Sequence, residues 1–365
     1  MSAPADIRSL TGVRGVAAVL IVLYHFGNVP LLGPGTAPYY RVPHGYLAVD
    51  LFFMLSGFVM AYIYRDAFRG EGFRHFRDFM VKRVARLYPA YWVIAVLYLL
   101  KLALGLDRDT LASFDAYDAV GNALMLTGWG LHVYPLVGVS WAASSELGSY
   151  FLLPVLLVVM FQRGLVVSVL ASVAALAAVV VIAMSGLGSA GPLDVTNGDS
   201  FLPLLRAVAG FALGLAIFRF SHHLDGLSMM AQDLLVGGLT LAIVVVGILF
   251  HHDLPIYLLF IPFVALLSRD GRLARLLYGN RLVYHLGAIS YSIYLMHQLF
   301  LSFTVRTSRH FGATPLSYAV CVAVALSVIW LLAWLSYRYV EMPGRRVLIA
   351  LLQPNKEAVA KGTAS

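Results

Sequence analysis

A chain of 365 residues with 60% hydrophobic and only 12% charged side chains is too apolar for a soluble domain, since soluble domains carry about 45–50% apolar and about 25% charged residues. Its formal net charge of +8 would suggest nucleic acid in a soluble protein, but here it fits Lys and Arg gathered at the cytoplasmic face of a membrane. We therefore expect an all-α integral membrane protein in contact with membrane lipid and with no nucleic-acid partner.

Ten apolar stretches are candidates for membrane spans, which need roughly 20 residues with a range of about 17–25. In chain order they are Val13–Phe26, Leu47–Tyr64, Leu87–Leu106, Ser140–Phe161, Leu165–Met184, Phe201–Phe218, Leu234–Phe250, Leu254–Leu267, Val283–Val305 and Leu316–Tyr337. The first could be a signal peptide, but it lacks an A-x-A cleavage site and leads into further spans, so we interpret it as a retained helix. A bundle of about ten transmembrane helices is predicted as one membrane domain over 1–353, followed by a polar, disordered tail over 354–365.

The distribution of Lys and Arg predicts the orientation of these spans, because both residues accumulate in cytoplasmic segments. With the N-terminus inside and Ala119–Val139 not crossing, 20 of the 26 Lys and Arg residues lie on the cytoplasmic side and five on the outer side. Counting Ala119–Val139 as a span would instead place the basic run Arg269–Arg281 outside. We expect both termini to be cytoplasmic and Ala119–Val139 to be an outer-face or re-entrant segment.

Ionisable residues inside spans are candidates for function, since a charge at mid-bilayer costs at least about 2.5–3.5 kcal/mol. The first span carries two of them, Arg14 and His25, which are eleven residues apart. That spacing is close to three helical turns, so both side chains share a face about 16 Å apart along the axis. Arg14 is then near the cytoplasmic surface and His25 near the outer side. Arg14 could equally be a snorkelling flank residue, and His25 a helix-end histidine among the headgroups.

The second span places Asp50 at its outer end, within GYLAVDLFFMLSGF. An aspartate there could hold His25 in one tautomer and stabilise its cationic form. It could also be a charge favoured by the helix dipole. Ser56 and Gly57, farther along the helix, favour close helix packing over chemistry.

The basic and aromatic stretch FRHFRDFMVKRVARLYPAYW precedes the third span, with Pro89 expected near the start of the helix. Arg83 and Arg86 are three residues apart and therefore share a helix face. Because arginine binds phosphate through two N–H groups, the pair could hold a phosphorylated cofactor such as coenzyme A. The alternative is an anchor for anionic lipid.

Two further ionisable residues lie deep in later spans, Glu146 in SWAASSELGSYF and Arg206 in FLPLLRAVAGFALG. A carboxylate at that depth needs a partner or a water-filled cavity. Glu146 could accept a proton or bind a sugar hydroxyl, or it could form a structural ion pair with Arg206.

The ninth span carries a polar stripe in HLGAISYSIYLMHQLF. Ser290, Tyr291, Tyr294 and His297 include pairs three and four residues apart, which is typical of a helix that lines a cavity or packs on another helix. His297 could be a satisfied core histidine or a catalytic one, and His285 is a further ionisable residue of this span.

Several kinds of site are unsupported by any motif. The sequence has no HExxH, Walker loop or G-x-S-x-G. Its single cysteine, Cys321, excludes an intramolecular disulfide and a cysteine-based metal site. We expect no metal cofactor.

With these residues in view, the chain resembles the acyltransferase 3 family of bacterial membrane O-acyltransferases. The resemblance extends from RSLTGVRGVAAVLIVLYHF to Glu341–Pro343. Five motifs carry it in order: Arg14 with His25, the Gly45–Phe58 block, Arg83 with Arg86 before Tyr-Pro, Trp141 with Glu146, and Ser290–His297. Ala142 and Ala143 stand where relatives are often polar. Each motif alone is weak, but five at family-like spacing on ten spans are specific.

The resemblance implies transfer of an acyl group, usually acetyl, from acyl-CoA to a hydroxyl of a carbohydrate or small molecule. Many relatives modify lipopolysaccharide, exopolysaccharide or other envelope glycans at the bacterial inner membrane. Some carry a fused SGNH hydrolase-like domain outside the membrane. We expect no such fused domain in this chain, which leaves open whether a separate extracytoplasmic partner protein completes the transfer.

The expected mechanism separates donor and base across the membrane. Arg14, Arg83 and Arg86 would hold the CoA phosphates, and His25, oriented by Asp50, would be the general base. Glu146, Arg206 and the stripe of Ser290, Tyr291 and His297 would position the acceptor or stabilise the oxyanion. The alternatives are the same chemistry on a macrolide or lipid acceptor, or a transporter or flippase, for which the expected internal repeats are not seen.

Overall fold

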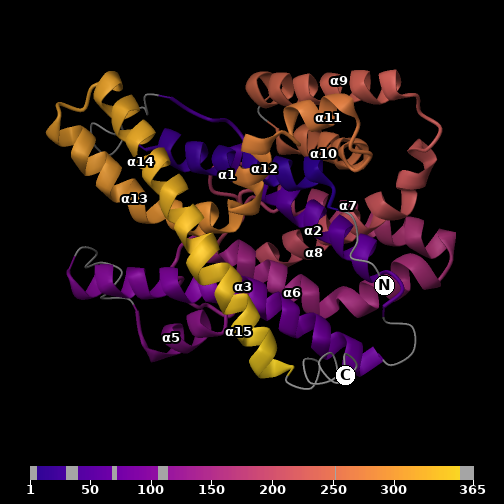
Figure 1. Ribbon diagram of the computed structural model, residues 1–365, viewed down its shortest axis with the longest axis horizontal. Coiled ribbons are helices and arrows are strands. Elements are labelled where there is room, and N and C mark those ends of the chain that lie inside the picture. Colours follow the sequence, from indigo (N-terminus) through magenta and orange to yellow (C-terminus); the bar gives the residue numbers. More distant parts are fainter. Residues whose placement is uncertain (1–5, 30–39, 68–71, 106–113, 251, 354–365) are drawn as a thin grey trace, which may run out of the picture.

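The computed structural model describes residues 6–29, 40–67, 72–105, 114–250 and 252–353, and the elements along these residues are all helical (Figure 1). The longer helices are α1 (Arg8–Gly27), α2 (Ala48–Tyr64), α3 (Gly72–Ala103), α6 (Ser140–Leu157), α7 (Leu165–Met184), α8 (Leu202–Phe220), α9 (Met229–Leu249), α10 (Asp253–Leu267), α13 (Ser290–His310) and α14 (Pro315–Ser336). The shorter ones are η1 (Gly45–Leu47), α5 (Ala116–Ala123), η2 (Val158–Gln162), η3 (Ser221–Leu224), α11 (Arg272–Leu277), α12 (Arg281–Ala288), η4 (Tyr337–Glu341) and α15 (Met342–Leu352). The tail expected at 354–365 lies outside the described residues.

Eight helical segments of the described chain are long and apolar enough to cross a membrane. They are Arg8–Gly27, Gly45–Tyr64, Arg74–Ala103, Ser140–Phe161, Leu165–Met184, Leu202–Leu224, Met229–Leu249 and Pro315–Leu352. Each contains most of one predicted span. The eighth predicted span corresponds to α10, which is apolar but has only 15 residues. The chain is therefore a multi-pass integral membrane protein with an all-helical bundle.

The predicted span Val283–Val305 is wrong as a single helix. The chain turns at Ile289, so that α12 and α13 are separate helices. Gly287, in the last turn of α12, lies directly against α1, where a β-carbon on it would be 1.9 Å from the carbonyl oxygen of Thr11. This backbone contact fixes α12 on α1, and α13 then leaves in another direction.

The stretch before the third predicted span is also helical, contrary to the expectation that the helix begins near Pro89. Helix α3 begins at Gly72 and Pro89 lies inside it. A proline inside a helix removes one hydrogen bond, and here its ring packs against α15, where a β-carbon on Gly344 would be 2.7 Å from Pro89 Cβ. Arg83 and Arg86 therefore do lie on one helix.

The segment Ala119–Val139 forms no membrane-crossing helix. It contains the end of α5, which has eight residues and is about 12 Å long at 1.5 Å per residue. Asn122 fixes the turn that follows α5, because its amide donates to the carbonyl of Tyr134 at 2.7 Å and its oxygen accepts from the backbone N–H of Leu136 at 2.8 Å.

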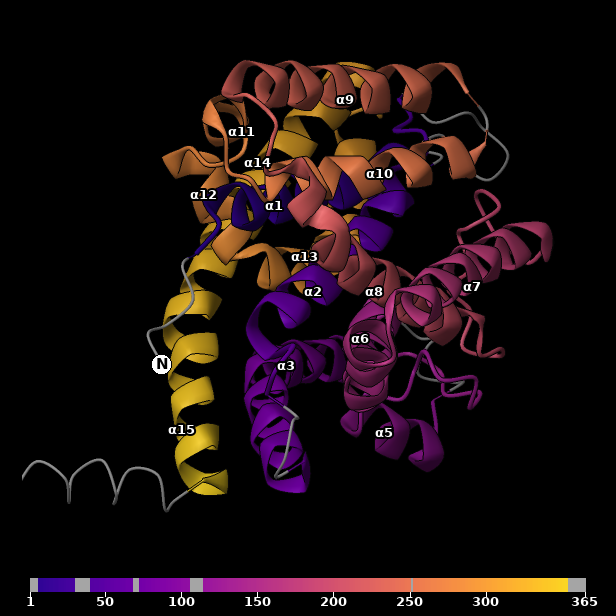
Figure 2. The ribbon, with the colours of Figure 1, turned by 90° about the vertical axis from the view of Figure 1, so that its right-hand side faces the viewer.

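Helix α9 lies at the edge of the bundle, where Figure 2 shows it along the top of the molecule. Leu234 is 69% exposed and Ile248 is 65% exposed. Val236 is the one buried residue of this helix, and an apolar helix so little covered by protein is stable only when lipid covers it.

The centre of the bundle is a close contact of α2 with α8. A β-carbon on Gly57 would lie 2.0 Å from the carbonyl oxygen of Phe211, and one on Gly214 would lie 2.1 Å from that of Met54. Small residues of this kind allow two backbones to touch. The predicted packing role of Gly57 is confirmed, whereas Ser56 contributes a hydrogen bond to Glu146.

Helices α3 and α15 extend side by side beyond the rest of the bundle (Figure 2). Helix α3 has 32 residues, about 48 Å, which exceeds a hydrocarbon core of about 30 Å. The π-helical turn η4 joins α14 to α15, and such turns occur frequently at functional sites. We call the end of the bundle with α15 and the first half of α3 the α15 end.

Candidate active site

A small cavity lies between α1, α2, α6 and α13, and we call it the central cavity. Its volume is about 40 Å³, which is room for a few water molecules because each needs at least about 10–15 Å³. The residues that line it are Arg14, Val49, Phe52, Phe53, Ala142, Ala143, Glu146, Ser290, Tyr291 and Tyr294. Four residues that the sequence predicted on three different spans therefore meet here. They are Arg14, Glu146, Ser290 and Tyr291.

Glu146 is the acidic residue of the central cavity. Its Oε1 accepts hydrogen bonds from the hydroxyls of Ser56 and Tyr150, each at 2.6 Å. Arg14 faces it across the cavity, with its guanidinium carbon 5.7 Å from the centre of the Phe52 ring. Arg14 and Glu146 both line the cavity, so two opposite charges lie in one site that lipid surrounds.

Arg83 and Arg86 lie toward the α15 end from this cavity, in two different environments. The Arg83 guanidinium packs 5.5 Å from the centre of the Phe79 ring and 5.7 Å from that of Tyr150. Its Nη2 donates to the hydroxyl of Tyr64 at 3.4 Å, while its buried Nε has no hydrogen-bond partner among the described residues. Arg83 is thus nearly covered by rings, which provide cation–π stabilisation.

Arg86 is near enough to two carboxylates to interact with them electrostatically. Glu146 and Glu341 both act on it electrostatically, and Arg86 and Arg14 in turn repel each other. Ser292 of α13 donates a hydrogen bond to Glu341. Glu341 was not predicted as a site residue, although the sequence carries a signal for it: an acidic residue directly after an apolar span and followed by Met-Pro.

His25 and His297 form a pair at the opposite end of this region. His297 Nε2 lies 3.2 Å from His25 Nδ1, and the ring centres are 4.8 Å apart. His297 Nδ1 lies 2.5 Å from the carbonyl oxygen of Tyr294, and His25 Nδ1 lies 2.9 Å from that of Ile21. His297 is fully buried, whereas His25 is only partly covered.

These contacts assign the tautomers. A nitrogen beside a carbonyl oxygen must carry a proton, so neutral His297 has N–H at Nδ1 and a bare Nε2. That bare nitrogen accepts from His25 Nδ1–H, which leaves the lone pair of His25 on Nε2. His297, together with Ile21, therefore fixes His25 as a base whose free nitrogen points away from the pair.

A row of rings joins the central cavity to the histidine pair. Arg14 lies over Phe52, the ring centres of Phe52 and Tyr294 are 6.4 Å apart, and those of Tyr294 and His297 are 5.9 Å apart. Tyr294 also donates from its hydroxyl to the carbonyl oxygen of Val139 at 2.8 Å. The cavity thus ends at aromatic side chains before it reaches the histidines.

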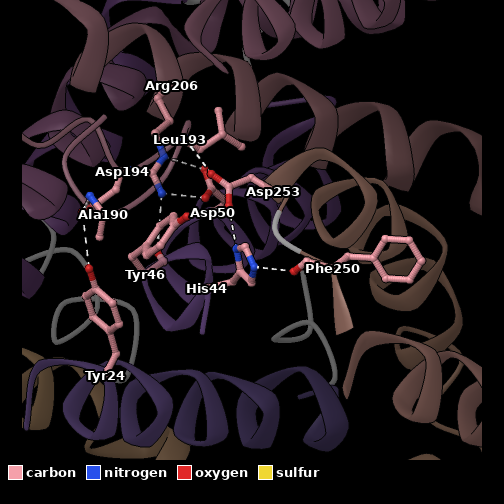
Figure 3. A network of polar contacts seen from close by, with 10 residues as sticks. All are labelled: Tyr24, His44, Tyr46, Asp50, Ala190, Leu193, Asp194, Arg206, Phe250 and Asp253. Atoms are coloured by element: carbon pink, nitrogen blue, oxygen red, sulfur yellow. Dashed lines mark hydrogen bonds and ion pairs between the residues drawn. The ribbon is translucent and has the colours of Figure 1, made fainter. Parts of the chain in front are cut away.

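Asp50 does not contact His25 as expected, and it pairs instead with Arg206 (Figure 3). Arg206 Nε donates to Asp50 Oδ1 at 2.8 Å and Nη2 donates to Oδ2 at 2.6 Å. Both side chains are completely buried, and the Arg206 guanidinium carbon lies 5.4 Å from the centre of the Trp141 ring. The ion pair of Glu146 with Arg206, considered from the sequence, is also wrong. A carboxylate on the first turn of α2 offers a buried guanidinium both of its oxygens, which is the strongest pairing available to it.

A second buried carboxylate, Asp253, extends this network (Figure 3). Its Oδ1 accepts from the Tyr46 hydroxyl at 2.5 Å and lies 2.7 Å from His44 Nδ1, and its Oδ2 accepts from the N–H of Leu193 at 2.6 Å. Arg206 Nη2 donates to the carbonyl of Tyr46 at 3.4 Å. The sequence did not indicate this network, because its members come from four separate segments.

The loop between α7 and α8 contributes Asp194 to the same region. Tyr24 donates from its hydroxyl to Asp194 Oδ2 at 3.3 Å, and the N–H of Ala190 donates to the same oxygen at 3.1 Å. Farther along this loop, hydrogen bonds from Asn197 and His132 lower the pKa of Asp199. The loop is thus held by acidic residues onto the bundle beside α1.

The described residues hold no group of three His, Cys, Asp or Glu side chains placed to bind a metal ion. The groups that the site does present are a histidine base, a cluster of arginines beside two carboxylates, and hydroxyls of Ser and Tyr. Together with the helical bundle, they define a multi-pass membrane protein with an intramembrane site suited to proton transfer and anion binding.

Comparison with known proteins gives the class. The model of the acyltransferase 3 family, described as an acyltransferase domain, matches residues 7–334. The chain therefore belongs to this family, as the resemblance of its motifs predicted. No solved structure matches it.

Curated relatives are distant. A Staphylococcus aureus (strain COL) protein named "Putative O-acetyltransferase SACOL0978" is 22% identical over 93% of this chain and 57% of its own length. A Bacillus subtilis (strain 168) protein named "Putative peptidoglycan O-acetyltransferase YrhL" is 28% identical over 34% of this chain and 17% of its own length. "Protein 2 in picA locus" of Rhizobium radiobacter is 42% identical over 25% of this chain and 42% of its own length. The matched part of this chain thus covers 57% of the Staphylococcus aureus protein and less than half of each of the other two.

Proposed function

We propose that this protein is an O-acyltransferase of the bacterial inner membrane that moves an acyl group, above all acetyl, from acyl-CoA to a hydroxyl of a cell-envelope or exported carbohydrate. The observation that carries the proposal is the pairing of His25 with His297 at 3.2 Å, which leaves His25 Nε2 free as a base, at the far end of a row of rings from an arginine cluster. Membership of the acyltransferase 3 family supports the reaction class.

In this proposal the donor binds from the α15 end, which is the cytoplasmic side. Arg86 and Arg83 hold the phosphates of acyl-CoA, because guanidinium groups bind phosphate oxygens bidentately. Arg14 lies deeper, where it meets the pantetheine arm or the thioester. Since the central cavity holds only a few waters, Phe52 and Tyr294 must turn aside for the arm to pass.

His25 performs the proton transfer. Its Nε2 removes the proton of the acceptor hydroxyl as the hydroxyl oxygen attacks the thioester carbonyl carbon. The carbon–sulfur bond then breaks, CoA leaves as the thiolate and takes up a proton, and the acyl group remains on the acceptor as an ester. General bases of this kind contribute about 10²–10⁴-fold to the rate.

The other predicted residues take supporting roles. His297 orients His25. Glu146 stabilises Arg14 and Arg86 near the thioester. Asp50 and Arg206 position the helices that flank the site, and Ser290 and Tyr291 contribute hydroxyls to the wall of the cavity, where substrate hydroxyls or the oxyanion can be bound.

The test is turnover by the purified protein in detergent, without a membrane gradient. Radiolabelled acetyl-CoA is offered with candidate acceptors, and release of the CoA thiol is measured together with ester formation. Acyl transfer that depends on the protein is expected. A transporter or flippase would instead require a sealed membrane and would release no CoA, and that result would contradict the proposal.

A further inference from the structure

A second, larger hollow lies where several membrane-crossing helices end, and we call it the α2–α8 pocket. Its volume is about 550 Å³, within the range of about 300–1,000 Å³ that ligand sites occupy. Its lining includes Arg65 directly after α2, Arg219 in the last turn of α8, Leu165 at the start of α7 and Arg269 just after α10. Because the ends of spanning helices lie near the lipid headgroups, the pocket faces a membrane surface, and the distribution of Lys and Arg predicts that this surface is cytoplasmic.

The charged side chains of the described lining are three arginines and one acid: Arg65, Arg219, Arg269 and Asp225. Arg269 Nη1 lies 2.5 Å from Asp225 Oδ1, and Arg65 Nε lies 3.2 Å from Oδ2 of its chain neighbour Asp66. Arg219 donates to the carbonyl oxygen of Met160 at 2.6 Å, and its described contacts include no carboxylate. Even with Asp66 counted and the lining histidines taken as neutral, the positive charges exceed the negative ones by one, so the pocket favours an anion.

Two of the guanidinium groups lie on one pair of aromatic rings. The guanidinium carbon of Arg65 is 5.2 Å from the centre of the Phe218 ring, and that of Arg219 is 5.8 Å from the centre of the Phe161 ring. The centres of these two rings are 6.1 Å apart. Cation–π contacts hold an arginine in place without removing its charge. Both groups therefore keep N–H donors for the oxygens of one phosphate.

The pocket continues into a lipid-facing stripe of α7, a helix at the outer edge of the bundle (Figure 2). Leu165, which lines the pocket, is 60% exposed, and Val169 and Val173 are 44% and 59% exposed. Residues four apart on a helix lie one above the other, so the three side chains form one apolar row that leads from the pocket into the membrane. An anion with hydrocarbon chains fits this combination, because its charge and its chains meet complementary surfaces.

We propose that the α2–α8 pocket binds the phosphate of an anionic phospholipid from the membrane leaflet at this surface. Arg65 and Arg219 hold the phosphate oxygens from the ends of α2 and α8, and the acyl chains lie along the exposed row of α7. Arg269 is shared between the phosphate and Asp225, so Asp225 competes with the lipid. The site is separate from acyl transfer, because its described lining includes none of the arginines proposed to bind the donor.

The first experiment measures charge selectivity. Delipidated protein in detergent is mixed with equal amounts of phosphatidylglycerol and phosphatidylcholine, which both contain a phosphate but differ in net charge, and bound lipid is counted by native mass spectrometry. Phosphatidylglycerol is expected to be retained about threefold more or better, since each arginine near the surface contributes about 1 kcal/mol. Arg65→Gln is expected to remove most of this preference.

The matched control for Arg65→Gln is Arg163→Gln. Arg163 is exposed between η2 and α7, at the same membrane surface but outside the described lining of the pocket. Its replacement removes the same charge and should leave the preference for phosphatidylglycerol unchanged. Equal retention of the two lipids by the wild type, or an equal loss in both variants, overturns the proposal.

The second experiment uses a variant that should bind more tightly, which damage to the fold cannot imitate. Asp225→Asn removes the acid that competes for Arg269, so the apparent Kd for phosphatidylglycerol should fall by about twofold or more, as for an exposed ion pair. Arg269→Gln should raise the same Kd. Native mass spectra recorded over a titration with the lipid give both values. Weaker binding by Asp225→Asn, or no change in either variant, overturns the proposal.

The third experiment locates the acyl chains and separates a lipid from a water-soluble phosphate. Phosphatidylglycerol and phosphatidylcholine that carry a diazirine in one acyl chain are photolysed with the protein, and the labelled peptides are identified. Residues 165–173 should be labelled more by the phosphatidylglycerol, and the double variant Arg65→Gln with Arg219→Gln should lose this excess. A large excess of sn-glycerol 3-phosphate or coenzyme A should leave the excess unchanged. Displacement by either compound would show that a soluble phosphate is the ligand, and equal labelling by the two lipids would show that no anionic lipid site exists here.

Discussion

The two groups of intramembrane charges differ in how completely they are paired. Asp50 and Arg206 pair through two hydrogen bonds and are fully buried, while Arg206 Nη1 has no hydrogen-bond partner among the described residues. Arg14 and Glu146 line a cavity, and they are only partly covered. A buried charge that is held by a bidentate partner stabilises the bundle, whereas a charge kept beside a cavity remains available to a substrate. We therefore propose that Asp50 and Arg206 are structural, and that Arg14 and Glu146 serve the reaction.

The largest effect is expected from breaking the buried pair. Arg206→Met leaves the Asp50 carboxylate without its partner, which costs about 3–5 kcal/mol when one member of such a pair is removed. Thermal unfolding of the purified protein in detergent should show this loss. The control is the double variant Asp50→Leu with Arg206→Met, which removes both charges and should recover most of the stability. A single variant as stable as the wild type would contradict the structural role.

A large effect on turnover is expected at His297. His297→Ala removes one of the two acceptors of His25 Nδ1–H and leaves only the Ile21 carbonyl, so kcat should fall by about 10²-fold with little change in the KM for acetyl-CoA. His297→Gln, which can offer an oxygen to the same N–H, should recover part of the rate. Because both histidines serve one step, His297→Ala should have no further effect in a His25→Ala background. Additive losses would show that His297 acts independently.

Glu146→Gln sharpens the comparison from the cavity side. Glutamine keeps an oxygen for Ser56 and Tyr150 but removes the charge that supports Arg14. Turnover should fall by about 10- to 100-fold, as expected for loss of an interaction with a charged group worth about 1.5–3 kcal/mol. The melting temperature should stay close to that of the wild type, unlike that of Arg206→Met. Unfolding of Glu146→Gln would place Glu146 with the structural charges instead.

The smallest effects are expected at the donor arginines. Arg86→Gln should raise the KM for acetyl-CoA by about tenfold, because the guanidinium is proposed to hold the phosphates of the donor. Arg83→Gln should raise the same KM and also lower the melting temperature, because its guanidinium packs on Phe79 and Tyr150. An unchanged donor KM in both variants would assign these arginines to lipid anchoring.

The sequence predicted the class of fold and most of the candidate site. Composition and span length indicated a helical membrane bundle, and helical spacing placed Arg14 with His25 on one face of α1. The same spacing placed Ser290 and Tyr291 on a cavity wall, where the structure has them. These features depend on local periodicity, which a single sequence displays.

Long-range partners could not be predicted in this way. Asp50 could reach either His25 or Arg206, and only the close packing of α2 on α8 through Gly57 and Gly214 decides for Arg206. The Asp253 network depends likewise on segments far apart in the chain. The turn at Ile289 was missed because the hydrophobic pattern continues through it, while the contact of Gly287 with α1 determines it.

The central claim is that donor binding and base catalysis are performed by separate groups, and the most direct test is His25→Ala. Binding of acetyl-CoA and acyl transfer are measured on the same purified sample, by equilibrium binding of the labelled donor and by ester formation. The account predicts donor affinity within about twofold of the wild type and a loss of transfer of at least about 10²-fold. Transfer at the wild-type rate by His25→Ala would contradict it.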